Sequence, residues 1–254
     1  MINATWCISS NIGDNLTPYI IRQITGSDPV YAQGGADYEH YVLAGSMLNH
    51  ANRNSIVWGA GLANITDGVN GGARLHAVRG PISRMRALSS RVPCPQVFGD
   101  PAILLPELYF PHIEKKYDIG IVPHYVDQFR AATWYTEGQH IINALQPVED
   151  FVDAILECSS IVSSSLHGII VAHAYGIPAL WVKMSDSIGG DDTKYRDYYM
   201  SVGMDTTNSV DLRENHEIPA IKLEAAPDMT IMREKFWNAC PLPMEKRLEK
   251  YRRG

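Results

Sequence analysis

The chain has 254 residues, 45% of them hydrophobic and 20% charged, which is enough for a full core in one large domain or two halves. Its formal net charge of −6 argues against a nucleic-acid-binding protein, because such proteins bind through a basic surface. The N-terminus lacks a secretory signal pattern and no stretch approaches the roughly 20 apolar residues that cross a bilayer, so we expect a cytoplasmic protein.

Short apolar runs alternate with helical patterns in the first part of the chain. Strands are expected at 6–9, 41–48, 55–62 and 75–79, with glycine turns ending the second and third. A helix over 16–25 is expected to stop at Gly26, and another begins with Pro81 in its first turn. Residues 97–105 are the last apolar segment of this first part of the chain.

The alternation restarts after the proline-bearing segment 109–117, which is predicted to be a linker. Strands are expected at 118–125, within 138–145 and at 160–163, with a short amphipathic helix over 148–156. This order predicts an α/β fold with mainly parallel strands. The restart favours two Rossmann-like halves facing a cleft, residues 1–112 and 113–254, over a closed barrel.

The stretch 158–182 is the most informative part of the chain. A strand leads into a serine cluster, a His-Gly pair, a helix and a second strand; the polar residues are Ser163, Ser164, Ser165 and His167. Ligands of open α/β sheets bind at strand carboxyl ends, and a helix N-terminus attracts anions. His167 is therefore a candidate acid–base group beside a phosphate or carboxylate site. The alternative is that a serine only caps the helix and His167 is a half-buried helix residue.

The loop after the first expected strand offers a second polar set, Asn11, Asp14 and Asn15. These side chains suit sugar hydroxyls, although a plain capped turn is the alternative. Neither a dinucleotide-binding fingerprint nor a P-loop is present.

Several cations are candidates for binding an anion. Arg79 and His124 follow expected strands, while Lys194 and Arg196 follow a Gly/Asp-rich stretch, 185–192, that is interpreted as a lid or as disorder. For Arg79, a lone arginine at a strand end, a surface position is the alternative. No His or carboxylate cluster accompanies Asp191 and Asp192, so we expect no metal site.

Three further expectations are structural. His173 lies in an apolar run and is predicted to be a satisfied core histidine, and Cys7 and Cys158 are predicted to be buried thiols. The basic tail 241–254 is interpreted as a solvated helix end, with contact to an anionic membrane surface as the alternative.

These pieces occur in one order, which is more specific than any one of them. The order is Asn-x-Gly-Asp at 11–14, Val-Arg-Gly-Pro at 78–81, Phe-Gly-Asp-Pro-Ala at 98–102, Pro-His-Tyr-Val-Asp at 123–127, and Ser-Ser-Ser-Leu-His-Gly at 163–168 with Gly-Ile-Pro-Ala at 176–179. It resembles the polysaccharide pyruvyl transferase family, and most of all its short bacterial exopolysaccharide branch. Other members often carry Arg where this chain has Ser165.

The resemblance implies a GT-B-like fold and transfer of pyruvate from phosphoenolpyruvate, a co-substrate, onto two hydroxyls of a sugar, with no bound cofactor. The product is a cyclic ketal, and phosphate is released. His167 is then the acid that protonates the enol carbon. The donor site would draw on Ser163, Ser164, Ser165, Arg79, His124, Lys183, Lys194 and Arg196, and the acceptor site on Asn11, Asp14 and Asn15.

The sugar acceptor is expected in an exopolysaccharide or cell-surface glycan precursor. A lipid-linked acceptor would bring the basic tail to the inner face of the membrane. Two alternatives remain: a GT-B glycosyltransferase that uses a nucleotide sugar, and a non-catalytic carbohydrate-binding protein.

Overall fold

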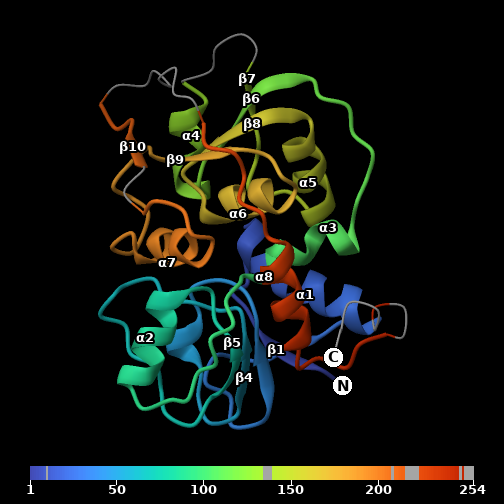
Figure 1. Ribbon diagram of the computed structural model, residues 1–254, viewed down its shortest axis with the longest axis vertical. Coiled ribbons are helices and arrows are strands. Elements are labelled where there is room, and N and C mark those ends of the chain that lie inside the picture. Colours follow the sequence, from blue (N-terminus) through green and yellow to red (C-terminus); the bar gives the residue numbers. More distant parts are fainter. Residues whose placement is uncertain (10, 134–138, 207–208, 215–222, 246–247, 249–254) are drawn as a thin grey trace.

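Two parallel five-stranded sheets form the framework of the protein (Figure 1). The computed structural model describes residues 1–9, 11–133, 139–206, 209–214, 223–245 and 248. The first sheet has the order β2-β1-β3-β4-β5, from β1 (Asn3–Thr5), β2 (Val30–Tyr31), β3 (His40–Val42), β4 (Ser55–Trp58) and β5 (Arg74–Ala77). The second has the order β10-β9-β8-β6-β7, from β6 (Tyr117–Val122), β7 (Gln139–Ile141), β8 (Cys158–Ser163), β9 (Ala179–Lys183) and β10 (Ser209–Asp211).

Helices connect the strands and lie against the sheets. The α-helices are α1 (Ile12–Thr25), α2 (Pro81–Ser89), α3 (Leu105–Leu108), α4 (Gln128–Ala131), α5 (Val148–Leu156), α6 (Leu166–Ala174), α7 (Thr193–Ser201) and α8 (Thr230–Asn238). Short 3₁₀ turns are η1 (Leu48–His50), η2 (Pro101–Leu104) and η3 (Tyr125–Asp127). The expected α/β class with two Rossmann-like halves is confirmed.

Some local predictions hold and others do not. Helix α5 has the predicted bounds, and α1 stops at Thr25 with Gly26 as its left-handed C-cap, φ 69°, as expected. The start of α1 was expected at Leu16, but the helix begins four residues earlier, at Ile12, directly after the extended Asn11. The first strand was expected at 6–9, but it is Asn3–Thr5, because pairing with β3 stops at Thr5. Trp6 lies beyond the strand and packs edge-on against Tyr31, 5.1 Å between ring centroids.

Of the cysteines expected to be buried, Cys158 is buried but Cys7 is exposed. The prediction for Cys7 is wrong because this residue follows the end of β1 and does not belong to its buried run. His173 is buried in the core as predicted, at 1% exposed, and its Nδ1 lies 2.9 Å from the Tyr198 hydroxyl. It is satisfied on that edge only, because its buried Nε2 has no hydrogen-bond partner among the described residues. Burial lowers the pKa of His173 to about 4.

The two halves share one large hydrophobic core, to which α1, α5, α6 and α8 all contribute. Helix α8 comes late in the chain but packs against the first half, where Phe236 stacks on Trp58 with ring centroids 4.4 Å apart. The Trp58 indole N–H also donates to the Phe236 carbonyl at 3.0 Å. In Figure 1, α8 lies beside α1 at the junction of the halves.

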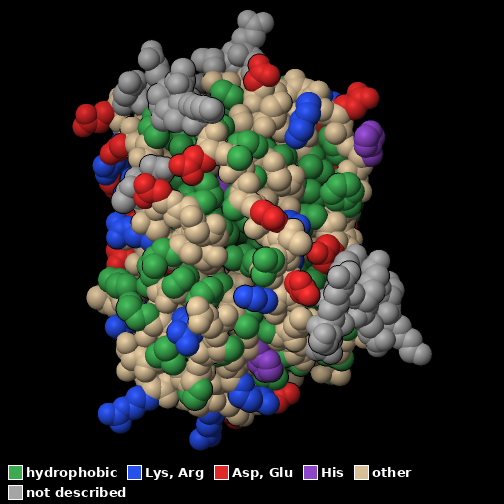
Figure 2. Space-filling view, viewed as in Figure 1, with side chains coloured by type: hydrophobic (Ala, Val, Ile, Leu, Met, Phe, Trp, Pro, Cys, Tyr) green, Lys and Arg blue, Asp and Glu red, His purple; other side chains and the backbone are tan. Residues whose placement is uncertain are grey.

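The surface carries charges of both signs. Figure 2 shows Lys and Arg side chains interspersed with Asp and Glu on one face, without a single basic surface spreading across it. None of the helices in the described part of the chain is long and apolar enough to cross a membrane. The basic tail considered for membrane contact falls largely outside the described residues.

Candidate active site

The serine cluster shapes the turn between β8 and α6. Ser163 Oγ lies 2.8 Å from the Val122 carbonyl oxygen and accepts the Ser165 N–H at 3.0 Å. Gly168 makes this packing possible, since a Cβ there would lie 2.5 Å from Ser163 Oγ. The Ser163 hydroxyl is thus committed to holding the N-terminus of α6 against β6.

Ser164 links this turn to the loop after β6. Its hydroxyl donates to Asp127 Oδ2 at 2.8 Å and accepts the His124 N–H at 2.9 Å. Asp127 is 1% exposed, and its second oxygen accepts the Ser185 hydroxyl. Asp127 was not among the residues chosen from the sequence, although it ends the Pro-His-Tyr-Val-Asp motif.

Ser165 occupies the N-cap position of α6, but its side chain makes no capping hydrogen bond. Among the described residues, its hydroxyl has no hydrogen-bond partner, although Ser165 is only 3% exposed. The first N–H groups of a helix also lack intrahelical partners. A free hydroxyl and open N–H groups together form a setting suited to an anion.

His167 projects from α6 of the second half onto residues of the first half. Its Nε2 lies 3.4 Å from Asp100 Oδ2, within ion-pairing distance, and Asp100 is fully buried. The other Asp100 oxygen accepts the Ala102 N–H at 3.0 Å and caps η2. Asp100 was also missed, although it lies in the Phe-Gly-Asp-Pro-Ala motif.

Gly13 of α1 creates the space for the imidazole. A Cβ at this position would lie 2.2 Å from His167 Nδ1, so any larger side chain would displace the ring. The neighbouring Ile12 N–H donates to the Ala144 carbonyl of the second half at 2.7 Å. The first turn of α1 and the first turn of α6 therefore meet directly at the junction.

Two further basic side chains, His124 and Lys194, lie close to each other, and His124 is also close to His167. Burial, and after it repulsion from Lys194 and His167, lowers the pKa of His124 to about 4. Burial and repulsion from Arg79 lower the pKa of Lys194 to about 8. No carboxylate lies within ion-pairing distance of Lys194 Nζ in the part of the chain that is described, and its nearest acceptor is the Gly189 carbonyl at 3.5 Å.

Arg79 lies in the same region, but it is fully buried. Its Nε is 3.3 Å from Asp197 Oδ2, and its other nitrogens donate to the Leu62 carbonyl at 2.5 Å and to Ser46 Oγ at 3.2 Å. Asp197, on α7, also accepts the Ser83 N–H at 3.0 Å. This ion pair therefore joins the end of β5 to the second half.

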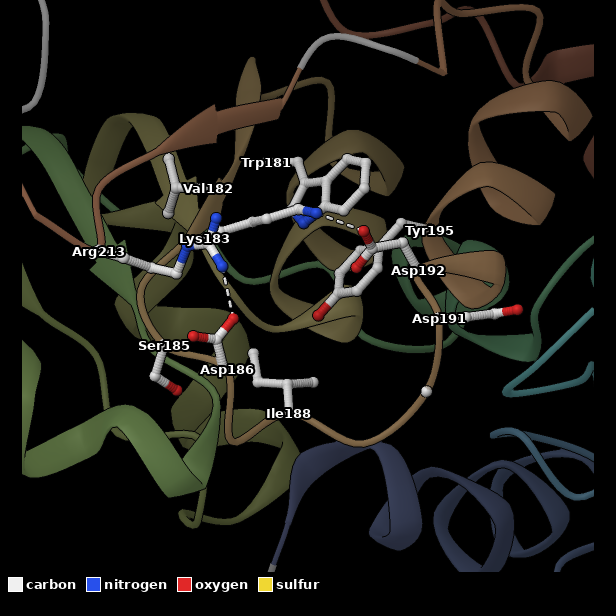
Figure 3. Close-up of a pocket in the computed structure, with 11 residues that line it drawn as sticks. Trp181, Val182, Lys183, Ser185, Asp186, Ile188, Asp191, Asp192, Tyr195 and Arg213 are labelled. Carbon is white, nitrogen blue, oxygen red and sulfur yellow. Dashed lines mark hydrogen bonds and ion pairs between the residues drawn. The ribbon is translucent and has the colours of Figure 1, made fainter.

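Lys183 and Arg196 lie near a hollow at the carboxyl ends of β9 and β10. Lys183 forms an ion pair with Asp192 and lines a cavity of about 240 Å³ (Figure 3). Arg196 is exposed and lines an adjoining cavity of about 410 Å³, which Lys183 shares. Among the described residues, no hydrogen bond or ion pair joins either cation to the N-terminus of α6.

The loop between β9 and α7, residues 184–192, is tied down at several points. Figure 3 shows Asp186 paired with Arg213, and Asp192 with Lys183. Asp191 accepts the Ile65 N–H of the first half at 3.0 Å. The loop thus spans from the second half to the first beside the site.

The sugar-binding residues expected from the sequence lie at the start of α1. Asn11 precedes the helix without capping it, and its buried Oδ1 has no hydrogen-bond partner among the described residues. Asp14 accepts the Ser9 hydroxyl at 2.5 Å, and Asn15 is half-buried in the same turn. Because Gly13 touches His167, this set lies across the junction from the α6 N-terminus.

Comparison with known proteins agrees with these motifs. The model of the polysaccharide pyruvyl transferase family matches residues 5–186. An uncharacterised protein of Acanthamoeba polyphaga mimivirus is 30% identical over 211 residues, which cover 73% of this chain and 71% of that protein. The crystal structure of an uncharacterised Klebsiella pneumoniae protein shares 12% identity with a TM-score of 0.47, over 78% of this chain and 86% of that one. From the family match, which spans the α1 turn, Asp100, His124 and His167, the chain belongs to the polysaccharide pyruvyl transferase family.

Proposed function

We propose that this protein transfers pyruvate from phosphoenolpyruvate onto two hydroxyls of a sugar in an exopolysaccharide or cell-surface glycan precursor. The observation that carries the proposal is that His124 is bonded to Ser164 beside the α6 N-terminus, with His167 and Lys194 close enough to act on its ring. Such an arrangement suits a small, highly charged anion. Phosphoenolpyruvate carries both a phosphate and a carboxylate.

His167 is the acid of the proposed reaction. It protonates the methylene carbon of the enol, and the positive charge that develops on the neighbouring carbon is attacked by a sugar hydroxyl. The buried Asp100 carboxylate lies 3.4 Å from Nε2 and orients the ring that must deliver this proton. The second hydroxyl then displaces phosphate. Of the two protons lost by the sugar, one restores His167 and the other leaves with phosphate.

Lys194 is the cation that we assign to the donor carboxylate. The charges of Arg79 and Lys183 are each offset by a carboxylate, from Asp197 and Asp192. Arg196 is exposed beside the neighbouring cavity, where it can contribute to the field felt by an entering anion. Phosphate would be held by Ser165 and the open N–H groups of α6.

The acceptor is placed on the side of the first half. Asn11, Asp14 and Asn15 offer carbonyl and carboxylate oxygens to sugar hydroxyls, across the junction from His167. The buried Oδ1 of Asn11, which has no hydrogen-bond partner among the residues that the structure describes, is the acceptor in this set that a hydroxyl would satisfy.

The test is incubation with phosphoenolpyruvate and a panel of glycans, following phosphate release together with the mass gain of a pyruvate ketal. His167→Gln should lower the rate by at least about 100-fold, in the range found for loss of a general acid. His112→Gln, at an exposed histidine outside the site, is the matched control and should leave the rate unchanged. Undiminished phosphate release in His167→Gln would refute the acid role.

The same panel separates the alternatives. Thermal stabilisation by a nucleotide sugar but not by phosphoenolpyruvate would identify a glycosyltransferase. Glycan binding that is unaffected by His167→Gln, with no turnover of either donor, would identify a carbohydrate-binding protein.

A further inference from the structure

His124 differs from His167 in what its ring already binds. It precedes η3, and its Nδ1 accepts the Val126 N–H at 3.5 Å as the cap of that turn. A ring nitrogen that accepts a hydrogen bond carries no proton. In the neutral ring the proton is therefore on Nε2.

The surroundings favour this neutral form. The ring is half-buried, and the titratable groups that reach it are Lys194 from α7 and His167 from α6, whose positive forms disfavour a further positive charge on His124. Tyr125 packs against the ring with centroids 4.4 Å apart. The backbone of His124 is held too, because its N–H donates to Ser164 Oγ.

The Nε2–H remains available. It makes no hydrogen bond to any residue that the structure describes, and the Val126 contact fixes the opposite edge of the ring. A neutral N–H donor can bind an anionic oxygen without adding charge beside Lys194 and His167. Because the lone pair on Nδ1 already accepts the Val126 N–H, the ring offers no free site to the proton that His167 must deliver.

We propose that His124 is a neutral hydrogen-bond donor, fixed in its Nε2–H form by Val126, that binds the phosphate of the donor substrate. This assignment rests on the proposed function, and it divides the two imidazoles into one that moves a proton and one that only binds. Phosphate is chosen over the carboxylate because His124 is bonded to Ser164, which adjoins the open N-terminus of α6.

Two substitutions at His124 test the roles of its two ring nitrogens separately. His124→Asn keeps an acceptor near the position of Nδ1 and loses the Nε2 donor, whereas His124→Gln keeps a donor near Nε2 and loses the cap. We expect His124→Asn to raise the KM for phosphoenolpyruvate and the inhibition constant of inorganic phosphate by about tenfold or more, as for a lost hydrogen bond to a charged group. Its melting temperature should stay within about 2 °C of the wild type.

His124→Gln should show the opposite pattern, with both constants within about threefold of the wild type and a melting temperature lower by a few degrees. Equal losses of affinity in the two variants, or wild-type affinity in His124→Asn, would overturn the assignment. A raised KM with an unchanged phosphate inhibition constant would overturn the choice of phosphate.

Nitrogen-15 NMR of the histidine rings at neutral pH tests the tautomer without any turnover. The expected spectrum has His124 protonated at Nε2 alone, and protonation at Nδ1 would refute the proposal. If the wild type releases no phosphate from phosphoenolpyruvate, the proposed function fails, while the ring spectrum and binding of inorganic phosphate still decide the role of His124.

Discussion

At the scale of single residues, the position of the His167 imidazole is set by the first half of the chain. Gly13 leaves the space that the ring occupies, and Asp100 lies against its Nε2. The sequence points to His167 because the strand, serine turn and helix around it are local. It does not reveal Gly13 or Asp100 as its neighbours, because their contact depends on how the halves meet.

Gly13→Ala tests this placement. The new methyl group would force the ring away from a position 2.2 Å from the added Cβ, and a misplacement of about 1 Å can lower a rate by about 100-fold. Alanine is the better helix former, so no loss of helix propensity is expected. Gly71→Ala, where an added Cβ meets nothing within 4 Å, is the control. Wild-type kcat in Gly13→Ala would show that the ring position is not required.

Lys194 gives the site a predictable pH dependence. With its pKa lowered to about 8, the ammonium is charged below that pH and neutral above it, so kcat/KM for phosphoenolpyruvate should fall as the pH rises through about 8. Lys194→Arg keeps its charge at higher pH and should move this decline upward.

The control for the pH profile is Lys116→Arg, at an exposed surface lysine paired with Glu157, which should retain the wild-type profile. A decline at the same pH in Lys194→Arg would assign it to a different group.

At the scale of elements, α8 ties the end of the described chain to its beginning. Phe236 stacks on Trp58, and Arg233 Nε donates to the Ile103 carbonyl at 2.8 Å. The Trp237 indole donates to Glu107. Helix α5 was predictable because its apolar spacing is regular, whereas α8 was not predicted: of its residues only Phe236 and Trp237 are buried.

Phe236→Ala measures what α8 contributes. Removing a buried aromatic ring at this junction should lower the free energy of unfolding by about 3–5 kcal/mol. Ile231→Ala, at a 68% exposed position of the same helix, should change it by less than about 0.5 kcal/mol. Denaturant unfolding followed by tryptophan fluorescence gives both values. Equal losses of unfolding free energy in the two variants would show that the Phe236 ring is not the main contact of α8.

At the scale of the whole molecule, the Arg79–Asp197 pair fastens the two halves beside the site. Both side chains are fully buried. Arg79 was chosen from the sequence as a donor-binding residue because it follows a strand, but its partner comes from α7, far along the chain. Only the packing of the halves brings the two charges together.

Asp197→Leu should lower the free energy of unfolding by about 3–5 kcal/mol, because it leaves the Arg79 charge buried without a partner. Combining it with Arg79→Met should restore part of that stability, since an apolar pair avoids the cost of burying charge, while the Ser83 N–H and hydroxyl still lack Asp197 as their acceptor. Thermal and denaturant unfolding of the two single variants and the double variant gives the free energies of unfolding for a double-mutant cycle. Equal destabilisation in both variants would contradict a simple charge pair, and an elevated KM for phosphoenolpyruvate in a stable double variant would support a direct role for Arg79 at the donor.

The features that the sequence by itself determined arise from residues close together along the chain. Alternating apolar runs and helix patterns predict the α/β class, and the order of short motifs identifies the family and points to the serine–histidine turn. The tertiary structure alone decided which partners the buried acidic residues bind, because Asp100, Asp127 and Asp197 reach a histidine, two serine hydroxyls and an arginine across loops and between halves. Spacing along a chain records neighbours within a strand or a helix turn, whereas burial and pairing of charge depend on how separate elements pack.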